Sequence, residues 1–326
     1  MGDYMQSAGG FGAGLSAAQI NRLRQMGRVW NRDISGHRQA VIEMFTPVVA
    51  AGRKDGIGLH RNLPYGPDPR NVVDVFVPRH SHVSPVVIFI HGGAFTRGSK
   101  SVNGDIYDNV LFWFAQQGFV AVNVEYRLAP AASFPAGPLD VASAIQWTVD
   151  NIARYGGDPA CIIAIGHSAG GSHLASYLLD PDIDVVPSPA IRAAIFVSAR
   201  LRLEIASDNP NADNVAACFG RDPNTLTARS PVMHADRCRW PVMIAFAEFE
   251  NRHLDTYSLE FAHRLSQGRR CAPRVIQCIG HNHTSIVAHF NSGDDNLGNA
   301  MLDFLARDCC ITAEPVKATS EPVPAL

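Results

Sequence analysis

The fold of this chain is decided at residues 161–171, which read CIIAIGHSAGG. The apolar run Cys161–Ile165 predicts a strand buried on both faces, and Ala169–Leu179 predicts a helix. Between them, Gly166 and Gly170 flank Ser168 in a Gly-x-Ser-x-Gly pattern. Glycines permit the sharp strand-to-helix turn that lifts a serine hydroxyl above a sheet. Because the helix amides and dipole then point to where negative charge develops, the pattern favours a nucleophile over an incidental turn serine.

Apolar and amphipathic segments alternate on both sides of this turn. Most later apolar runs are continuous rather than alternating, which is typical of buried strands in a parallel sheet. The predicted strands are Val72–Val77, Val86–Ile90, Phe119–Val124, Cys161–Ile165, Ala193–Val197, Val242–Phe246 and Val275–Ile279. The predicted helices are Gly104–Gln117, Leu139–Tyr155, Ala169–Leu179, Leu254–Gln267 and Leu297–Arg307. The alternation predicts one α/β domain, residues 1–326, with a doubly wound, mostly parallel sheet.

Three segments lie outside this alternation. Residues 15–50 predict the helices Leu15–Met26 and Gln39–Val49, and residues 205–237 are polar and rich in Asn, Asp and Pro. An apolar helix face must be buried, so we expect these two segments to form a small helical cap over the ends of the strands. The alternative is that the helices pack on the side of the sheet. The tail 312–326 contains three prolines and few apolar residues, and we expect it to be disordered.

Composition excludes several classes of protein. The 326 residues include 28 Lys+Arg and 30 Asp+Glu without a basic run, which argues against a nucleic-acid partner. No apolar stretch reaches the roughly 18 residues of a membrane span. The first fourteen residues lack the basic start and apolar centre of a secretory signal, and the seven cysteines contain no CxxC pair. We therefore expect a cytoplasmic protein with reduced thiols.

A second glycine motif, HGGAF, follows the predicted strand Val86–Ile90 at residues 91–95. Adjacent glycines at a strand end let the backbone approach a bound group closely, whereas the motif alone is equally compatible with a tight turn. Together with the serine turn, it predicts an oxyanion hole. The expected amide donors are those of Gly92, Gly93, Ala94 and Ala169. We expect His91 to hold this loop rather than to transfer protons.

Several motifs occur in the order found in a known superfamily. They are HGG at 91–93, EYRLAP at 125–130, FPA at 134–136, Asp140, YGGDP at 155–159 and GHSAGG at 166–171. With them the chain resembles the α/β-hydrolase superfamily, specifically the hormone-sensitive-lipase-like esterases and the neighbouring kynurenine-formamidase-like branch. LPYG at 63–66 and VDVFVP at 73–78 favour the second branch. The resemblance covers residues 63–307 and implies the α/β-hydrolase fold, although Ala94 replaces a glycine usual in the esterases.

The resemblance also implies an acid after the strand Val242–Phe246. In the resembled families this segment has a small residue, a polar one, any residue and then the acid, which selects Glu250. Glutamate departs from the commoner aspartate but serves in some triads. Glu248 and Asp255 remain alternatives, and Glu248 and Glu250 are each also compatible with a solvated loop carboxylate.

The catalytic base is expected in the segment GHNHTSIV at residues 280–287. The resemblance places it just before a pair of short residues and an Ile-Val, which selects His283, with His281 supporting the loop. The His-x-His pair with His289 nearby also permits a metal-site interpretation. A metal site needs three or four convergent ligands, and the hydrolase order already explains His283, so we expect no metal.

Together these features predict a serine hydrolase that cleaves a small carboxylic ester through Ser168, His283 and Glu250 without a cofactor. An aryl formamide or another small amide is the alternative substrate. A non-catalytic hydrolase-fold protein that binds a ligand is the alternative class, but such chains typically lose the serine or the histidine. Many members of the resembled families form homodimers, and no interface can be identified from the sequence.

Overall fold

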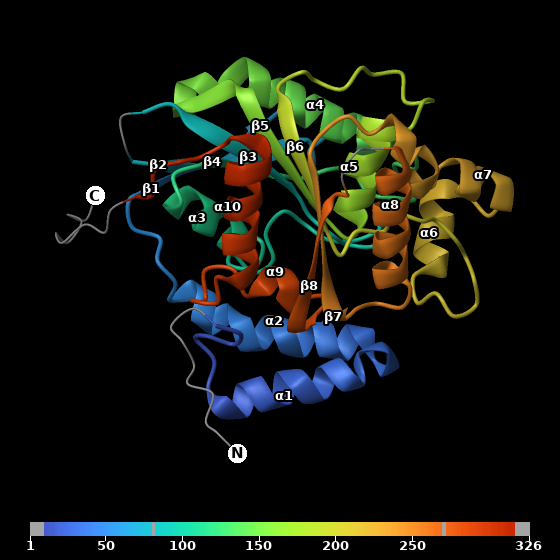
Figure 1. Ribbon diagram of the computed structural model, residues 1–326, viewed down its shortest axis with the longest axis horizontal. Coiled ribbons are helices and arrows are strands. Elements are labelled where there is room, and N and C mark those ends of the chain that lie inside the picture. Colours follow the sequence, from blue (N-terminus) through green and yellow to red (C-terminus); the bar gives the residue numbers. More distant parts are fainter. Residues whose placement is uncertain (1–9, 80–81, 269–271, 317–326) are drawn as a thin grey trace.

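A central sheet organises the computed structural model, which describes residues 10–79, 82–268 and 272–316. Within these residues the sheet has eight strands in the order β1-β2-β4-β3-β5-β6-β7-β8 (Figure 1). They are β1 Ile57–Pro64, β2 Val72–Pro78, β3 Ser84–Ile90, β4 Val120–Val124, β5 Gly157–His167, β6 Ile191–Val197, β7 Val242–Phe249 and β8 Arg274–Asn282. β2 is antiparallel to β1 and β4, and the remaining pairs are parallel. The predicted doubly wound, mostly parallel sheet is confirmed.

The sheet differs from the sequence prediction mainly at its edges. β1 was not predicted, because most of its side chains are exposed and give no apolar run. β8 is the other edge strand, and its exposed Val275 and Ile279 alternate with less exposed residues. The central strands β3 and β4 are buried almost throughout, as their continuous apolar sequence predicts.

Helices cover both faces of the sheet (Figure 1). One apolar core joins the sheet to α4 (Ala136–Asn151), α5 (Ala169–Leu179) and α8 (Leu254–Gly268). The core on the opposite face contains α3 (Asp108–Gln116), α9 (Ser285–Ala288) and α10 (Asn296–Cys309). The predicted helix 139–155 is divided, because after Asn151 the chain continues as the 3-10 helix Ile152–Tyr155.

Two N-terminal helices lie across the end of the sheet next to β7 and β8 (Figure 1). α1 (Ala17–Arg28) begins at Ser16 with a capping box, and α2 (Ile34–Ala50) begins at Asp33, whose carboxylate accepts a hydrogen bond from Gly36. The sequence placed the second helix five residues too late, because its first turn, Ile34-Ser35-Gly36-His37, has little apolar character. The apolar faces of both helices share a core with Ile106 and Ala288.

The segment 205–237 contains two short helices and a 3-10 helix. They are α6 (Ala212–Phe219), α7 (Pro223–Ala228) and Pro231–Arg237. Val215, Cys218 and Phe219 of α6 pack in one cluster with Phe95 and Ala169, so this segment lies beside the serine turn.

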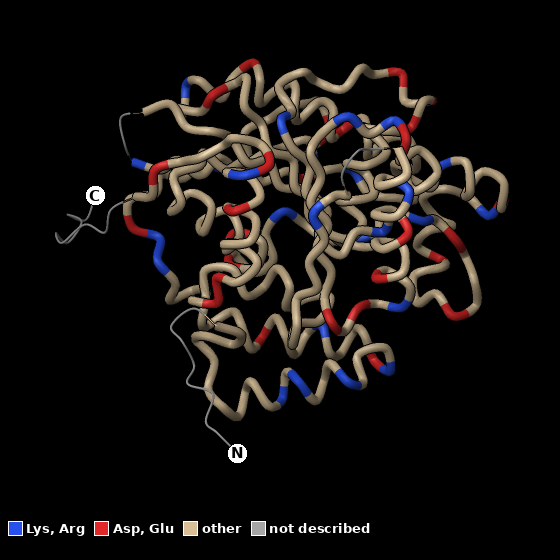
Figure 2. The backbone as a smooth tube through the Cα atoms, viewed as in Figure 1, with Lys and Arg blue, Asp and Glu red and all other residues tan. Residues whose placement is uncertain are grey.

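At the C-terminal end, Val316 is attached to the body of the protein. Its amide donates to Gln116, and its carbonyl accepts from Arg53. The predicted disorder of the tail otherwise concerns residues 317–326, which lie outside the described residues. Acidic and basic residues are interspersed over the molecule, whereas α1 carries Arg22, Arg24 and Arg28 and no acidic residue (Figure 2). Among the described helices, none combines the length and the hydropathy that crossing a membrane requires.

Candidate active site

The serine turn is built by the close approach of β5, α5 and β3. Ser168 lies between β5 and α5 with φ 53° and ψ −119°, an unusual conformation for a residue with a side chain. A Cβ atom on Gly170 would come within 2.3 Å of the Ile90 carbonyl oxygen. The first turn of α5 can therefore approach the end of β3 only because residue 170 is glycine, which explains this part of the motif.

Ser168, His283 and Glu250 form a continuous chain of contacts. His283 Nε2 lies 3.0 Å from Ser168 Oγ, and His283 Nδ1 lies 2.7 Å from Glu250 Oε2. The other carboxylate oxygen, Oε1, accepts hydrogen bonds from the Ala247 amide at 2.8 Å and from the Ser198 hydroxyl. The structure thus brings together the three residues that the sequence selected. The structure adds Ser198, which the sequence analysis did not identify. The only sequence feature that could have indicated a role for Ser198 is its position directly after β6.

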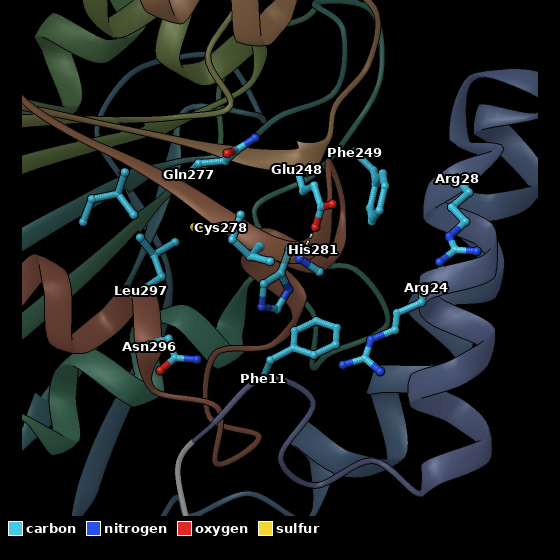
Figure 3. A pocket seen from close by; sticks show the side chains of 13 residues that line it. Phe11, Arg24, Arg28, Glu248, Phe249, Gln277, Cys278, His281, Asn296 and Leu297 are labelled. Atoms are coloured by element: carbon cyan, nitrogen blue, oxygen red, sulfur yellow. Dashed lines mark hydrogen bonds between the residues drawn. The ribbon is translucent and has the colours of Figure 1, made fainter. Parts of the chain in front are cut away.

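The alternative acids lie elsewhere. Glu248 Oε2 accepts a hydrogen bond from the Gly280 amide at 2.7 Å, and Asp255 is exposed in the first turn of α8. Glu248 lines a separate cavity of about 590 Å³, where Figure 3 shows it across from Arg24 and Arg28 of α1. Ser168 and His283 do not line this larger cavity. Of the three acids, Glu250 is the one that contacts His283.

The second glycine motif lies against the serine. A Cβ atom on Gly92 would be 2.9 Å from Ser168 Cβ, so only glycine fits there. Gly93 has φ 152°, and a Cβ atom on it would be 1.8 Å from the Arg97 carbonyl oxygen. Ala94 adopts φ 50°, a left-handed conformation that glycine adopts at lower cost. This backbone explains why a third glycine is usual here, and Ala169 is the first residue of α5, as expected.

Ser168 and His283 open into a pocket of about 220 Å³. Its apolar lining includes Trp30, Ile34, Ile42, Val102, Ile106 and Val287, and its polar lining includes Arg38, Arg97, Tyr107, Asn211 and Asn251. The N-terminal helices supply much of this wall. The aromatic residues Phe95 and Phe219 do not line this pocket and pack edge to face with ring centroids 5.2 Å apart.

The turn between α1 and α2 holds the loop that carries Glu250. Trp30 Nε1 donates to Asn251 Oδ1 at 2.8 Å, and Asn31 Nδ2 donates to the Glu250 carbonyl oxygen at 2.9 Å. In return, the Arg252 amide donates to Asn31 Oδ1 at 3.0 Å. The sequence gave no sign of these contacts, because the partners are more than 200 residues apart in the chain.

His167 supports the backbone of His283. Its Nε2 lies 3.1 Å from the His283 carbonyl oxygen, and its Nδ1 lies 3.3 Å from the Tyr107 hydroxyl. Burial, with a smaller effect from the charge of His283, lowers the pKa of His167 well below its usual value. The ring is therefore neutral at pH 7 and donates one proton, which Nε2 directs to the carbonyl oxygen.

His281 lies in a buried cluster with His289 and Asp294. His281 Nε2 is 3.3 Å from an Asp294 carboxylate oxygen, which also accepts the Gly12 amide at 2.9 Å. One potential ligand atom from each of the three residues lies within 4.8 Å of the others. Among the described residues, this cluster rather than His283 would be the group able to hold a metal ion. Its contacts connect the catalytic loop to the N-terminal segment, as expected for a loop-supporting His281.

His91 and Glu125 stabilise the loop that follows β3. His91 Nε2 lies 3.3 Å from Glu125 Oε1, whereas Glu125 Oε2 accepts the Lys100 amide at 2.9 Å. Burial alone would raise the pKa of Glu125, but His91, the Lys100 amide and Arg70 lower it to about 2. His91 thus binds a structural carboxylate and lies outside the chain of contacts to Ser168.

Comparison with known sequences places the similarity in the region of these motifs. The BD-FAE family model matches residues 73–179. The esterase LipC of Mycobacterium tuberculosis is 38% identical over 136 residues, covering 41% of this chain and 33% of LipC. Human cocaine esterase is 33% identical over 121 residues, covering 33% of this chain and 21% of that protein. The matched part of this chain thus spans a third or less of these relatives.

Solved structures extend the likeness to most of the fold. A hyperthermophilic esterase from Pyrobaculum calidifontis has a TM-score of 0.67 at 20% identity, covering 90% of this chain and 99% of that one. A bacterial heroin esterase has a TM-score of 0.63 at 23% identity, covering 86% and 93%. With the sheet order described above, these structures show that the chain has the α/β-hydrolase fold.

Proposed function

We propose that this protein is a serine hydrolase that cleaves small carboxylic esters by acyl transfer. The observation that carries the proposal is the chain of contacts from Ser168 through His283 to Glu250, with Gly92 packed against the serine. These contacts support the roles of nucleophile, base and acid that a triad needs. The similarity to several esterases gives independent support.

The proposed reaction begins with His283 Nε2 taking the proton of Ser168 as Oγ attacks the substrate carbonyl carbon. Glu250 fixes the imidazole through Nδ1–H and stabilises the imidazolium that forms. His283 then gives the proton to the leaving alcohol, and an acyl-enzyme remains. Water, deprotonated by the same imidazole, attacks the acyl carbon, and the imidazolium returns the proton to Ser168 Oγ as the acid is released. No cofactor takes part in these steps.

The negative oxygen of each tetrahedral intermediate needs fixed donors. We assign the amides of Gly93, Ala94 and Ala169 to this role, with Gly92 making room beside the serine. Ala94 in a left-handed conformation keeps the backbone course that a glycine would have. The assignment rests on the position of these residues along the pocket and at the start of α5.

We further propose that the N-terminal helices act as a cap that limits the size of the substrate. Trp30 and the α2 residues Ile34 and Ile42 line the same pocket as Ser168. Its volume of about 220 Å³ is below the roughly 300–1,000 Å³ common for ligand pockets. A short acyl group therefore fits best. The segment 205–237 contributes through Asn211, which lies just before α6.

A panel of substrates tests the proposed activity. We expect p-nitrophenyl acetate and butyrate to be cleaved with a higher kcat/KM than long-chain esters, and Ser168→Ala to abolish turnover. N-formyl and N-acetyl anilides in the same panel test the small-amide alternative. Failure of the parent enzyme to cleave any ester or anilide would contradict the proposal and favour a protein that only binds a ligand.

A further inference from the structure

The catalytic pocket contains two arginines that the proposed reaction does not use. Arg38 comes from α2 and Arg97 from the loop after β3, and both line the pocket that holds Ser168. The described lining of this pocket includes no aspartate or glutamate. Its charge is therefore positive, although the whole chain has a formal net charge of −2.

The position of each arginine follows from its neighbours. Arg38 lies one helical turn from both Ile34 and Ile42, which line the same pocket, so all three share one face of α2. Arg97 is held at the end of the glycine loop, where its amide donates to the Gly93 carbonyl oxygen at 3.1 Å. The two arginines thus reach the pocket from two different elements, α2 and the loop after β3.

Within residues 10–79, 82–268 and 272–316, neither guanidinium is neutralised by a carboxylate. Among the described residues, no carboxylate forms an ion pair with Arg38 or Arg97, and the one side-chain hydrogen bond found for Arg97 is a long one, 3.5 Å to Asn211 Oδ1. Partial burial and, to a smaller extent, the charge of Arg38 lower the pKa of Arg97. Two like charges brought together without a counter-ion repel each other, and a bound anion removes this cost.

We infer that the pocket selects substrates that carry a carboxylate, which Arg38 and Arg97 bind while the scissile carbonyl meets Ser168. Arginine matches the planar carboxylate through paired hydrogen bonds. The inference rests on the proposed hydrolase function and narrows its substrates to short anionic esters or amides. The carboxylate belongs either to the acyl part or to the leaving group, and the chemistry of recognition is the same.

The test compares matched anionic and neutral esters. Monoethyl glutarate carries the carboxylate on the acyl side and 4-acetoxybutanoate on the alcohol side, and each is paired with its primary-amide counterpart. For at least one pair we expect the parent enzyme to favour the anionic ester by about ten- to a hundredfold in kcat/KM, the range for charged hydrogen bonds. This ratio should fall as the salt concentration rises.

Variants assign the preference to the two arginines. Arg38→Gln and Arg97→Gln should each lower the anionic-to-neutral ratio, and the double variant should bring it close to one. Arg22→Gln on the exposed surface of α1 is the matched control and should keep the parent ratio. Equal or better cleavage of the neutral ester in both pairs, or an anionic preference that survives in the double variant, would overturn the inference.

A binding measurement separates this inference from the proposed reaction. Calorimetry on Ser168→Ala, which cannot turn over the esters by the proposed route, should show tighter binding of the anionic member of a pair. Adding Arg38→Gln should reduce this difference, and adding both Arg38→Gln and Arg97→Gln should abolish it. If the parent cleaves nothing but this difference is present, the proposed reaction fails while the carboxylate site stands. If neutral esters are cleaved and no difference in binding exists, the carboxylate site fails alone.

Discussion

At the scale of single residues, the acid is the most sharply defined assignment. Glu250 contacts His283 Nδ1 at 2.7 Å, whereas Glu248, two residues earlier, accepts a hydrogen bond from Gly280. Along an extended chain, residues two apart point the same way, so their spacing does not separate them. The two acids are separated by the turn after Phe249, which carries Glu250 back towards Ala247. The Glu250 carboxylate accepts a hydrogen bond from the Ala247 amide.

We predict that Glu250→Gln lowers kcat by several orders of magnitude, because an amide cannot fix the working tautomer of His283 as a carboxylate does. Glu248→Gln is the matched control, with the same chemical change beside the other cavity, and should lower kcat much less. Steady-state rates on one short ester measure both. A larger loss for Glu248→Gln would show that the acid assignment is displaced by two residues.

The site residues that could not be predicted from the sequence all depend on tertiary contacts. Trp30, Asn31, Arg38 and Ser198 reach the site only through tertiary contacts, and none belongs to a motif with a fixed spacing. Ser168 and Gly92, in contrast, are specified by their own turns, where a side chain on the neighbouring glycine would collide with the backbone. Local steric requirements can therefore be predicted from the sequence, whereas contacts between distant segments cannot.

At the scale of elements, the turn between α1 and α2 is part of the candidate active site, because it holds residues 250–252. Trp30→Phe keeps most of the packing but removes the hydrogen bond to the buried Asn251. Leaving that oxygen without a partner should lower the free energy of unfolding by about 1–3 kcal/mol. We also expect kcat to fall, because Asn251 adjoins Glu250. Urea unfolding and steady-state rates measure the two effects, and a variant with the parent's stability and kcat would contradict the role of this turn.

The wall that α2 contributes should set the length of the acyl chain. Ile34→Ala removes apolar volume from the catalytic pocket and should raise kcat/KM for longer esters relative to acetate. Each additional methylene that becomes buried contributes about 0.8 kcal/mol, or roughly fourfold. The measurement is the rate over p-nitrophenyl esters of graded length.

Ile279→Ala is the matched control for this prediction, since Ile279 is exposed on the edge strand β8 and does not line the catalytic pocket. It should leave the chain-length profile as it is in the parent. If Ile34→Ala also leaves the profile unchanged, α2 does not act as a cap.

At the scale of the whole molecule, the inner strands could be predicted because buried parallel strands are continuously apolar. The edge strand β1 could not be predicted, since its mostly exposed residues form no continuous apolar run. The N-terminal helices were predicted as elements, but their place across the ends of β7 and β8 depends on contacts that no local pattern encodes. The residues in motifs could therefore be predicted from the sequence, whereas the residues that the N-terminal helices bring to the site could not.

The fold buries histidines that must remain uncharged, and this predicts a loss of stability in acid. Burial lowers the pKa of His173 and of His289 to about 3, against 6.5 for the free side chain. Below pH 6.5 the unfolded chain takes up these protons while the folded protein does not, so stability falls as the pH is lowered towards 3. Each histidine contributes a slope of about 1.4 kcal/mol per pH unit in this range.

Urea unfolding between pH 7 and pH 5 measures this slope. His173→Gln should reduce it by the contribution of one proton, while its packing cost is the same at every pH and serves as the internal reference. A variant whose stability falls with pH as steeply as the parent's would contradict the neutral state of His173 in the fold.

The central claim is that Ser168, activated by His283, attacks the substrate, and covalent labelling tests it most directly. A fluorophosphonate should modify the parent protein once, with peptide mass spectrometry placing the adduct on Ser168, and His283→Ala should slow the labelling by several orders of magnitude. Ser168→Ala should take up no label. An adduct on another residue, or labelling of His283→Ala within about tenfold of the parent rate, would contradict the account.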